Sequence, residues 1–297
     1  MPLSSDVVIP APTERNASAV TPQPDQQPRL WDDYVGSYEE VFEPLTNAFA
    51  RRALDALRLT SGARLLDVGA GAGGAALLAA ARALDVTAID ASRGMVERIR
   101  ARFQGGAAPG GGLRAAVMDG TALALPDGTF DAAISVFGVI IFPDFSAGLR
   151  EIARVLKSGG RAAIVTRTEV HRYELATRLA AAVALVREAA SIDPPTPGPL
   201  PAQLRFREEP VFRAALEEAG FGVETIMLME ERWRAPSAHW IGERLAFAPG
   251  MATQLAELGS RREAVIARFV ETLIEDQGSG VVALPAVAHA GMVVKPS

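Results

Sequence analysis

The chain has 297 residues, of which 49% are hydrophobic and 22% charged, and its formal net charge is -5. This size suits one large α/β domain or two small ones. The acidic balance, with scattered basic residues, argues against a nucleic-acid partner. The chain contains no cysteine, which excludes disulfides, thiol catalysis and cysteine metal sites. Its three histidines also argue against a histidine-rich metal site.

The start of the chain differs in composition from the rest. Residues 1–29 are rich in Pro, Ser, Thr and Gln and show no apolar period, so we expect a disordered tail. No apolar run in the sequence is long enough to span a bilayer. The segment Met1–Pro10 lacks the basic head and apolar core of a secretory signal. We therefore expect a cytoplasmic protein whose folded domain covers residues 30–297.

Aromatic residues recur at helical spacing where the folded domain is expected to begin. Trp31, Tyr34 and Tyr38 share a face that Phe49 continues after Pro44. An aromatic stripe of this kind is more often core than binding site, so we favour amphipathic helices that pack on the domain. The alternative, that Trp31, Tyr34 or Tyr38 also lines a ligand pocket, stays open.

A glycine-rich turn organises the chain. An apolar run at 63–68 contains Asp67 near its end, and only glycine and alanine follow at 69–74 before an alanine-rich helix begins. Glycines let the backbone approach a ligand closely, and a helix N-terminus presents free N–H groups and partial positive charge. The stretch predicts a strand, a nucleotide-type binding turn and a helix.

Two glycine patterns overlap in this turn. Gly69, Gly71 and Gly74 satisfy the G-x-G-x-x-G fingerprint of dinucleotide-binding folds. Gly69, Gly71 and Gly73, with Asp67 two residues ahead, satisfy the acid-x-G-x-G-x-G pattern of class I S-adenosylmethionine (SAM) methyltransferases. The glycines alone do not choose between these, nor do they exclude a loop without a ligand.

Strands and helices alternate after the turn, which predicts a parallel sheet with helices on both faces. The second strand ends at Asp90, where a carboxylate can accept hydrogen bonds from both ribose hydroxyls. The predicted strands lie at 63–68, 84–89, 113–117, 131–136, 161–166, 221–229 and 286–294. Segments predicted to be mostly helical include 169–191, 210–219, 233–239, 240–247 and 251–274. Helical insertions at about 168–208 and 230–278 are placed to cover the mouth of the sheet as a lid.

An ordered series of motifs runs through residues 66–160. Its members are Leu66–Gly73, Ile89–Ser92 with Met95, Asp119–Gly120, Leu125–Pro126 with Phe130–Asp131, and Arg154–Gly160. The series resembles the class I SAM-dependent methyltransferases, in the branch of the ubiquinone/menaquinone C-methyltransferases and many natural-product methyltransferases. The resemblance implies a Rossmann-like, seven-stranded, mostly parallel sheet with an antiparallel last strand, helices on both faces and a helical lid.

The resemblance also implies roles at the methionine end of SAM. The backbone of Gly69, Ala70 and Gly71 would lie against the methionine part, and Asp67 would help to hold its amino group. Val136 and Phe137 would place backbone against the same amine.

At the other end of the cofactor, the resemblance implies an adenosine site. Asp90 would accept from the ribose hydroxyls, while Ala91 and Met95 would pack on the adenine. Asp119 would accept from the adenine amino group, with the Gly120 N–H nearby.

The implied function is transfer of a methyl group from SAM to a small, largely apolar molecule by in-line displacement. The acceptor atom (O, C or N) and the oligomeric state are not readable from the sequence. A general base is needed only if the acceptor must lose a proton. His171, just after the fifth strand, is the candidate base, with Tyr173, His239 and Glu169 as weaker ones, and a surface histidine is the equally open alternative. An NAD(P)-dependent oxidoreductase and a non-catalytic SAM-binding protein are the alternative functions.

Overall fold

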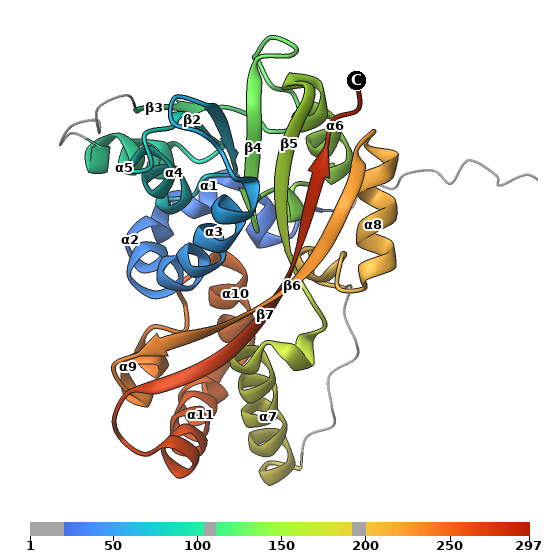
Figure 1. Cartoon of the computed structure of the whole chain (residues 1–297). Coiled ribbons are helices and arrows are strands. Elements are labelled where there is room, and N and C mark those ends of the chain that lie inside the picture. Colours follow the sequence, from blue (N-terminus) through green and yellow to red (C-terminus); the bar gives the residue numbers. More distant parts are fainter. Residues whose placement is uncertain (1–20, 104–110, 192–199) are drawn as a thin grey trace, which may run out of the picture.

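The computed structural model describes residues 21–103, 111–191 and 200–297 (Figure 1). Within them the strands form one seven-stranded sheet in the order β3-β2-β1-β4-β5-β7-β6. The pairs from β3 to β5 are parallel, and β7 is antiparallel to both of its neighbours. The strands are β1 (Arg64–Val68), β2 (Asp85–Asp90), β3 (Gly112–Val117), β4 (Phe130–Val136), β5 (Leu156–Arg167), β6 (Gly222–Ala235) and β7 (Val282–Val294). The predicted fold class is confirmed.

Helices cover both faces of the sheet because successive strand residues point to opposite sides. Leu65 belongs to one buried cluster and Leu66 to the other. The first cluster is closed by α3 (Glu43–Leu57), α4 (Gly74–Ala80) and α5 (Arg93–Phe103), and the second by α6 (Phe145–Val155) and α8 (Glu209–Glu218). The core therefore has two layers with the sheet between them, and the loops at the carboxyl ends of the parallel strands are free to form a site.

The last two strands are longer than the sequence predicts. β6 runs on to Ala235 and pairs with β7 along its whole length, so that Trp233 lies opposite Leu284. The predicted helix at 233–239 is therefore wrong for its first five residues, since 233–235 are strand and the next helix begins only at Ala238. The reason is tertiary: the buried Trp233 ring packs edge-on against Phe42 and Phe247, and this burial outweighs local helix preference.

Further helices follow β5 and β6, namely α7 (Glu174–Ala189), α9 (Ala238–Glu243), α10 (Pro249–Glu257) and α11 (Arg262–Gln277). Along the chain, α7 precedes β6, and α9, α10 and α11 follow it. Helices α7, α9 and α11 lie at the far end of the long β6–β7 ribbon, and α10 lies nearer the middle, in contact with the 3-10 helix η1 (Pro24–Gln26) (Figure 1). α11 packs against α7 and α9. No helix among the described residues is both long and apolar enough to cross a bilayer.

Ordered structure begins before residue 30, earlier than expected. The predicted tail lies outside the described residues at 1–20, but 3-10 helix η1 (Pro24–Gln26) and helix α1 (Pro28–Trp31) follow it. The Gly250 N–H at the start of α10 donates to Asp25 Oδ1 at 2.7 Å. Trp31 Nε1 donates to the Asp25 carbonyl at 2.9 Å. After these turns, η2 (Asp32–Tyr34), α2 (Val35–Ser37) and the π-helical turn η3 (Tyr38–Phe42) lead into α3.

Candidate functional site

A cavity of about 650 Å³ lies at the carboxyl ends of the parallel strands. This volume is in the range of small-molecule sites. Nine of the predicted binding residues line it: Gly69, Gly71, Asp90, Ala91, Met95, Asp119, Gly120, Val136 and Phe137. The other two, Asp67 and Ala70, line an adjoining small cavity of about 20 Å³ that shares Gly69 and Val136 with the large one. The structure therefore brings all the predicted cofactor residues to one place.

The glycine turn after β1 takes a backbone path that side chains would block. Gly69, Gly71 and Gly73 have φ of 69°, 54° and 91°, in the left-handed region that glycine enters without cost. A Cβ on Gly69 would lie 2.8 Å from the Gly138 Cα. The turns that follow β1 and β4 thus touch through their backbones, which leaves the cavity wall open to a ligand.

Asp90 fixes the turn as well as facing the cavity. Its Oδ2 accepts from the Gly71 N–H at 2.9 Å, and its Oδ1 accepts from the Ser92 N–H at 2.8 Å. Burial raises the pKa of Asp90 to about 6. Each carboxylate oxygen can accept a second hydrogen bond, so both remain available to a pair of hydroxyls in the cavity.

Asp67 lines the small cavity, and one of its carboxylate oxygens accepts no hydrogen bond from the part of the chain that the structure describes. Its side chain is 1% exposed, and its Oδ2 has no donor among the described residues. Burial, reinforced by the Asp90 charge, raises the pKa of Asp67 to about 7. Asn47 Oδ1 lines the same cavity and also lacks a donor there. Two buried acceptors without donors therefore line one cavity and are suited to bind a hydrogen-bond donor. That donor is either a water molecule, for which about 20 Å³ is enough, or a cationic group.

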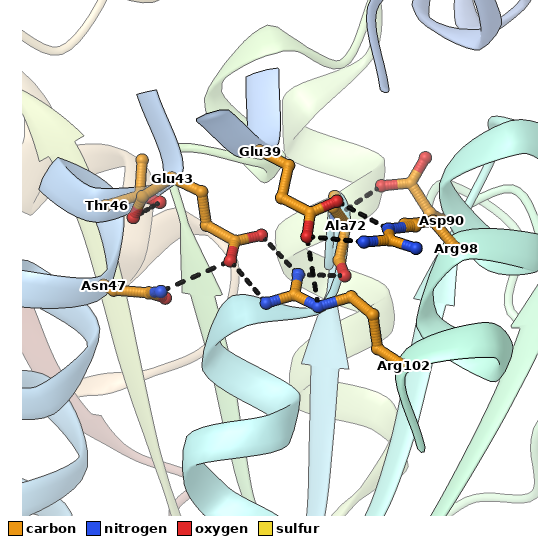
Figure 2. A network of polar contacts seen from close by, with 9 residues as sticks. Glu39, Glu43, Thr46, Asn47, Ala72, Asp90, Arg98 and Arg102 are labelled. Atoms are coloured by element: carbon orange, nitrogen blue, oxygen red, sulfur yellow. Dashed lines mark hydrogen bonds and ion pairs between the residues drawn. The ribbon is translucent and has the colours of Figure 1, made fainter. Parts of the chain in front are cut away.

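An arginine behind the turn ties it to the N-terminal helices (Figure 2). Arg102 Nη1 donates to the Ala72 carbonyl and to Glu43 Oε2, both at 2.8 Å, and its Nη2 donates to Glu43 Oε1 at 2.8 Å. Glu43, at the start of α3, is 4% exposed. Glu39 on η3 pairs with Arg98 and Arg102 beside it. This network spans residues 39–102, and no pattern in the sequence indicates it.

The far end of the glycine-lined half suits a flat ring. Met95 is buried and lines the wall with the exposed Ala91. Asp119 is exposed, and its Oδ1 accepts from the Thr121 N–H at 2.8 Å, so the carboxylate also closes an Asp-Gly turn. The Phe142 ring covers Gly120 so closely that a Cβ there would overlap it.

A family model described as "Methyltransferase domain" matches residues 66–164, from β1 into β5. These residues, a third of the chain, therefore resemble a methyltransferase domain. The chain is 36% identical over 118 residues to a ubiquinone/menaquinone biosynthesis C-methyltransferase UbiE of Geobacter sulfurreducens, covering 39% of this chain and 46% of that protein. The chain spans about half the length of the curated relatives that it matches.

Two solved structures share the fold of this chain. A putative methyltransferase from Bacillus halodurans superposes with a TM-score of 0.55 at 18% identity, covering 84% of this chain and 99% of that one. A phosphoethanolamine N-methyltransferase 2 of Haemonchus contortus, in complex with phosphomonomethylethanolamine and S-adenosylhomocysteine, superposes with a TM-score of 0.52 at 18% identity. The match covers 90% of this chain and 58% of that one.

The residues present fit SAM, the cofactor of this family. The orphaned acceptors of Asp67 and Asn47 match its amino group, which is a cationic donor. The free acceptor capacity of Asp90 matches the two ribose hydroxyls. The apolar wall at Met95 matches the face of an adenine ring.

The second half of the main cavity comes from distant parts of the chain. Its lining residues include Asp25, Trp31, Phe42, Phe142, Arg167 and Gln203. Of the three aromatic residues considered as pocket residues, Trp31 and Tyr38 line the cavity, and Tyr34 is not among its described lining. Trp31 and Tyr38 pack against the core, as the preferred interpretation predicts, with 5.8 Å between their ring centroids, and they line the cavity as well.

Asp25 and Arg167 carry no sequence signal for this location. Asp25 falls in the stretch that composition assigns to a tail, and Arg167 is one residue beyond the predicted fifth strand. Only the fold brings them together. Burial raises the pKa of Asp25 against the hydrogen bonds from Gly250 and Gln203 and the charge of Arg167.

The structure places the candidate base His171 outside this cavity. His171 is exposed and lines a separate surface hollow with Arg172, Glu230 and Arg232. In the part of the chain that the structure describes, neither His239, which is exposed, nor His289, which is buried in β7, lines the main cavity. Tyr173 is half-buried and is not among the described lining of the main cavity, and its ring lies 4.4 Å from the Arg167 guanidinium carbon. The placement gives no support to a histidine base.

Phe137 joins the two halves of the cavity. It follows β4 with a φ of 59°, which is uncommon for a bulky residue. Its N–H donates to the Val165 carbonyl at 3.0 Å, and its ring meets Phe49 edge-on at 5.5 Å between centroids. These contacts hold the residue in a conformation that it would not adopt alone.

Proposed function

We propose that this chain transfers a methyl group from SAM to a small molecule bound in the second half of the same cavity. The observation that carries the proposal is the continuity of one cavity of about 650 Å³, one half fitted to an adenosyl ligand and the other lined by aromatic side chains. A cofactor-binding module without an acceptor would have no use for that second half. The names of the relatives do not determine the acceptor atom.

The chain's own residues would act by binding, orienting and excluding water. SAM, when bound, supplies an activated methyl group on a sulfonium. Asp90 would hold the ribose through its remaining lone pairs, and Asp67 with Asn47 would hold the amino group. Trp31, Phe42 and Phe142 would confine an acceptor beside the cofactor. Positioning two reactants in line lowers the entropic part of the barrier, and an apolar wall limits competing contact with water.

The alternative of a dinucleotide-dependent oxidoreductase finds less support. Its only basis is the overlapping G-x-G-x-x-G at Gly69, Gly71 and Gly74. The doubly wound dinucleotide fold repeats the nucleotide-binding unit on the other side of the switch point. In the described residues, β5 is followed there by the antiparallel β7–β6 pair.

Calorimetric titration with SAM, S-adenosylhomocysteine and NADH tests the proposal. We expect micromolar binding of the two adenosyl ligands and no binding of NADH. Asp90→Ala should weaken S-adenosylhomocysteine binding about 100-fold, since two hydrogen bonds to a charged group are lost and each factor of ten corresponds to about 1.4 kcal/mol. Asp85→Ala, at the other end of β2 and paired with the exposed Arg114, is the matched control.

Either of two results would contradict the cofactor site. One is binding of NADH alone. The other is unchanged affinity in a folded Asp90→Ala variant. Release of S-adenosylhomocysteine from SAM in the presence of a methyl acceptor separates a catalyst from a protein that only binds SAM.

A further inference from the structure

Arg167 ends β5 at the wall of the second half of the cavity. Its guanidinium carbon lies 4.4 Å from the centroid of the Tyr173 ring and 5.4 Å from those of Phe42 and Phe137. The side chain is half-buried. Three rings on different elements thus surround one planar cation and restrict its position, an arrangement that guanidinium tolerates better than ammonium because it is less strongly hydrated.

The described residues supply no carboxylate within 4.0 Å of Arg167. Arg102 is also partly buried, but unlike Arg167 it forms a bidentate ion pair with Glu43. A partly desolvated cation without a counter-ion is costly. A guanidinium in this state at the wall of a cavity is suited to bind an anion that enters it.

Asp25 is an acidic residue at the wall of this half of the cavity, and both of its carboxylate oxygens already accept hydrogen bonds. Its Oδ1 accepts from the Gly250 N–H at 2.7 Å, and its Oδ2 accepts from the Gln203 side-chain amide. It lies within electrostatic range of Arg167 but beyond ion-pair distance. Asp25 therefore joins three segments and forms no ion pair with the Arg167 guanidinium.

We propose that the methyl acceptor carries an oxyanion, a carboxylate or phenolate, on a flat apolar frame, and that Arg167 binds this oxyanion. The inference rests on the proposed function, since it names the acceptor class of that same site. The planar guanidinium offers two parallel N–H donors, which match the two oxygens of a carboxylate and also hold a single phenolate oxygen. The rings of Trp31, Phe42 and Phe142 suit the flat frame.

The test uses the full chain saturated with S-adenosylhomocysteine and two probes of equal shape, naphthoate and naphthamide. Titration by calorimetry or ligand-observed NMR should show about tenfold tighter binding of the anion, as expected for one hydrogen-bonded charge pair. Arg167→Gln should reduce this preference to less than about twofold, while Arg167→Lys should keep part of it because a charge remains without the fork. Arg161→Gln, six residues earlier on β5 and paired with Glu224 outside the cavity, should leave the preference unchanged.

The outcomes separate this inference from the proposed function. Failure of wild-type protein to bind S-adenosylhomocysteine would overturn the proposed function before any acceptor probe is added. Normal binding of S-adenosylhomocysteine with equal affinity for naphthoate and naphthamide would overturn the acceptor class alone. Weaker S-adenosylhomocysteine binding in a folded Arg167→Gln variant, with the anion preference intact, would show that Arg167 clamps the cofactor's carboxylate, and it would also overturn the inference.

Discussion

The two halves of the cavity are built in different ways. Apart from Asn47 on α3, the cofactor half uses residues from one continuous part of the chain, between Asp67 and Phe137, and much of its contact surface is backbone at glycine. The acceptor half uses side chains from residues 25–42, from Phe142, from Arg167 and from Gln203. A site made of consecutive strand ends is visible in the sequence, whereas a site made of distant side chains becomes visible only when the chain has folded.

Each half is also held in place by the hydrogen bonds of one charged side chain. Arg102 holds the glycine turn to α3 behind the cofactor half. Asp25 joins η1 to α10 and to the 3-10 helix η6 (Ala202–Leu204) over the acceptor half. If the two halves bind their ligands independently, substitution of Arg102 or Asp25 should weaken the affinity for one ligand and leave the other unchanged.

Arg102→Met is expected to have the largest effect. It leaves the Glu43 carboxylate buried without its partner, which should lower the free energy of unfolding by about 3 kcal/mol. S-adenosylhomocysteine should also bind more weakly, because the Ala72 carbonyl in the turn loses its donor. Urea denaturation measures the first effect and calorimetry the second. Arg98→Met, which breaks the more exposed pair with Glu39, should lower the free energy of unfolding much less, and equal losses in the two variants would contradict this account of the turn.

Asp25→Asn should act on the acceptor half. It weakens the charged hydrogen bonds from Gly250 and Gln203, with an expected cost of about 1.5 kcal/mol in the free energy of unfolding. The fall in naphthoate affinity should exceed the fall in S-adenosylhomocysteine affinity, which should stay within about twofold. Urea denaturation and titration with each ligand measure these effects. Asp33→Asn, an exposed neighbour, is the control. A larger loss for the cofactor than for naphthoate would show that the halves are not separable.

The smallest expected effect is a pH dependence confined to the cofactor half. Burial raises the pKa of Asp67 to about 7 and that of Asp90 to about 6. Because the folded protein holds these protons more tightly than the unfolded chain does, the ligand-free protein should lose stability as pH rises from about 4 to about 7. Binding of the amino group needs ionised Asp67, so S-adenosylhomocysteine should bind about fivefold to tenfold more tightly at pH 8 than at pH 6.

Calorimetry at the two pH values checks the titration. Asp67→Asn should bind the ligand more weakly and lose most of the dependence. The anion preference set by Arg167 should stay constant over this range, because guanidinium does not titrate there. A cofactor affinity that does not change between pH 6 and pH 8 would remove Asp67 from the amino-group site.

The sequence predicted what local chemistry determines. The neighbouring residues in the sequence are enough to predict strand ends, positive-φ glycines and the position of Asp90. All eleven predicted cofactor residues line the two adjoining cavities. The sequence did not predict the extension of β6 through Trp233, because packing against Phe42 and Phe247 decides it. It also did not predict the ordering at Asp25, whose partners lie 178 and 225 residues away.

Phe137 contributes to both halves of the cavity. Its backbone belongs to the wall of the cofactor half, and its ring lies under the Arg167 guanidinium. With a left-handed backbone held by Val165 and an edge-on contact to Phe49, the ring has little freedom to adjust to one ligand alone. A substitution of Phe137 would therefore change the wall of the cofactor half and the support of Arg167 together, unlike a substitution of Arg102 or Asp25.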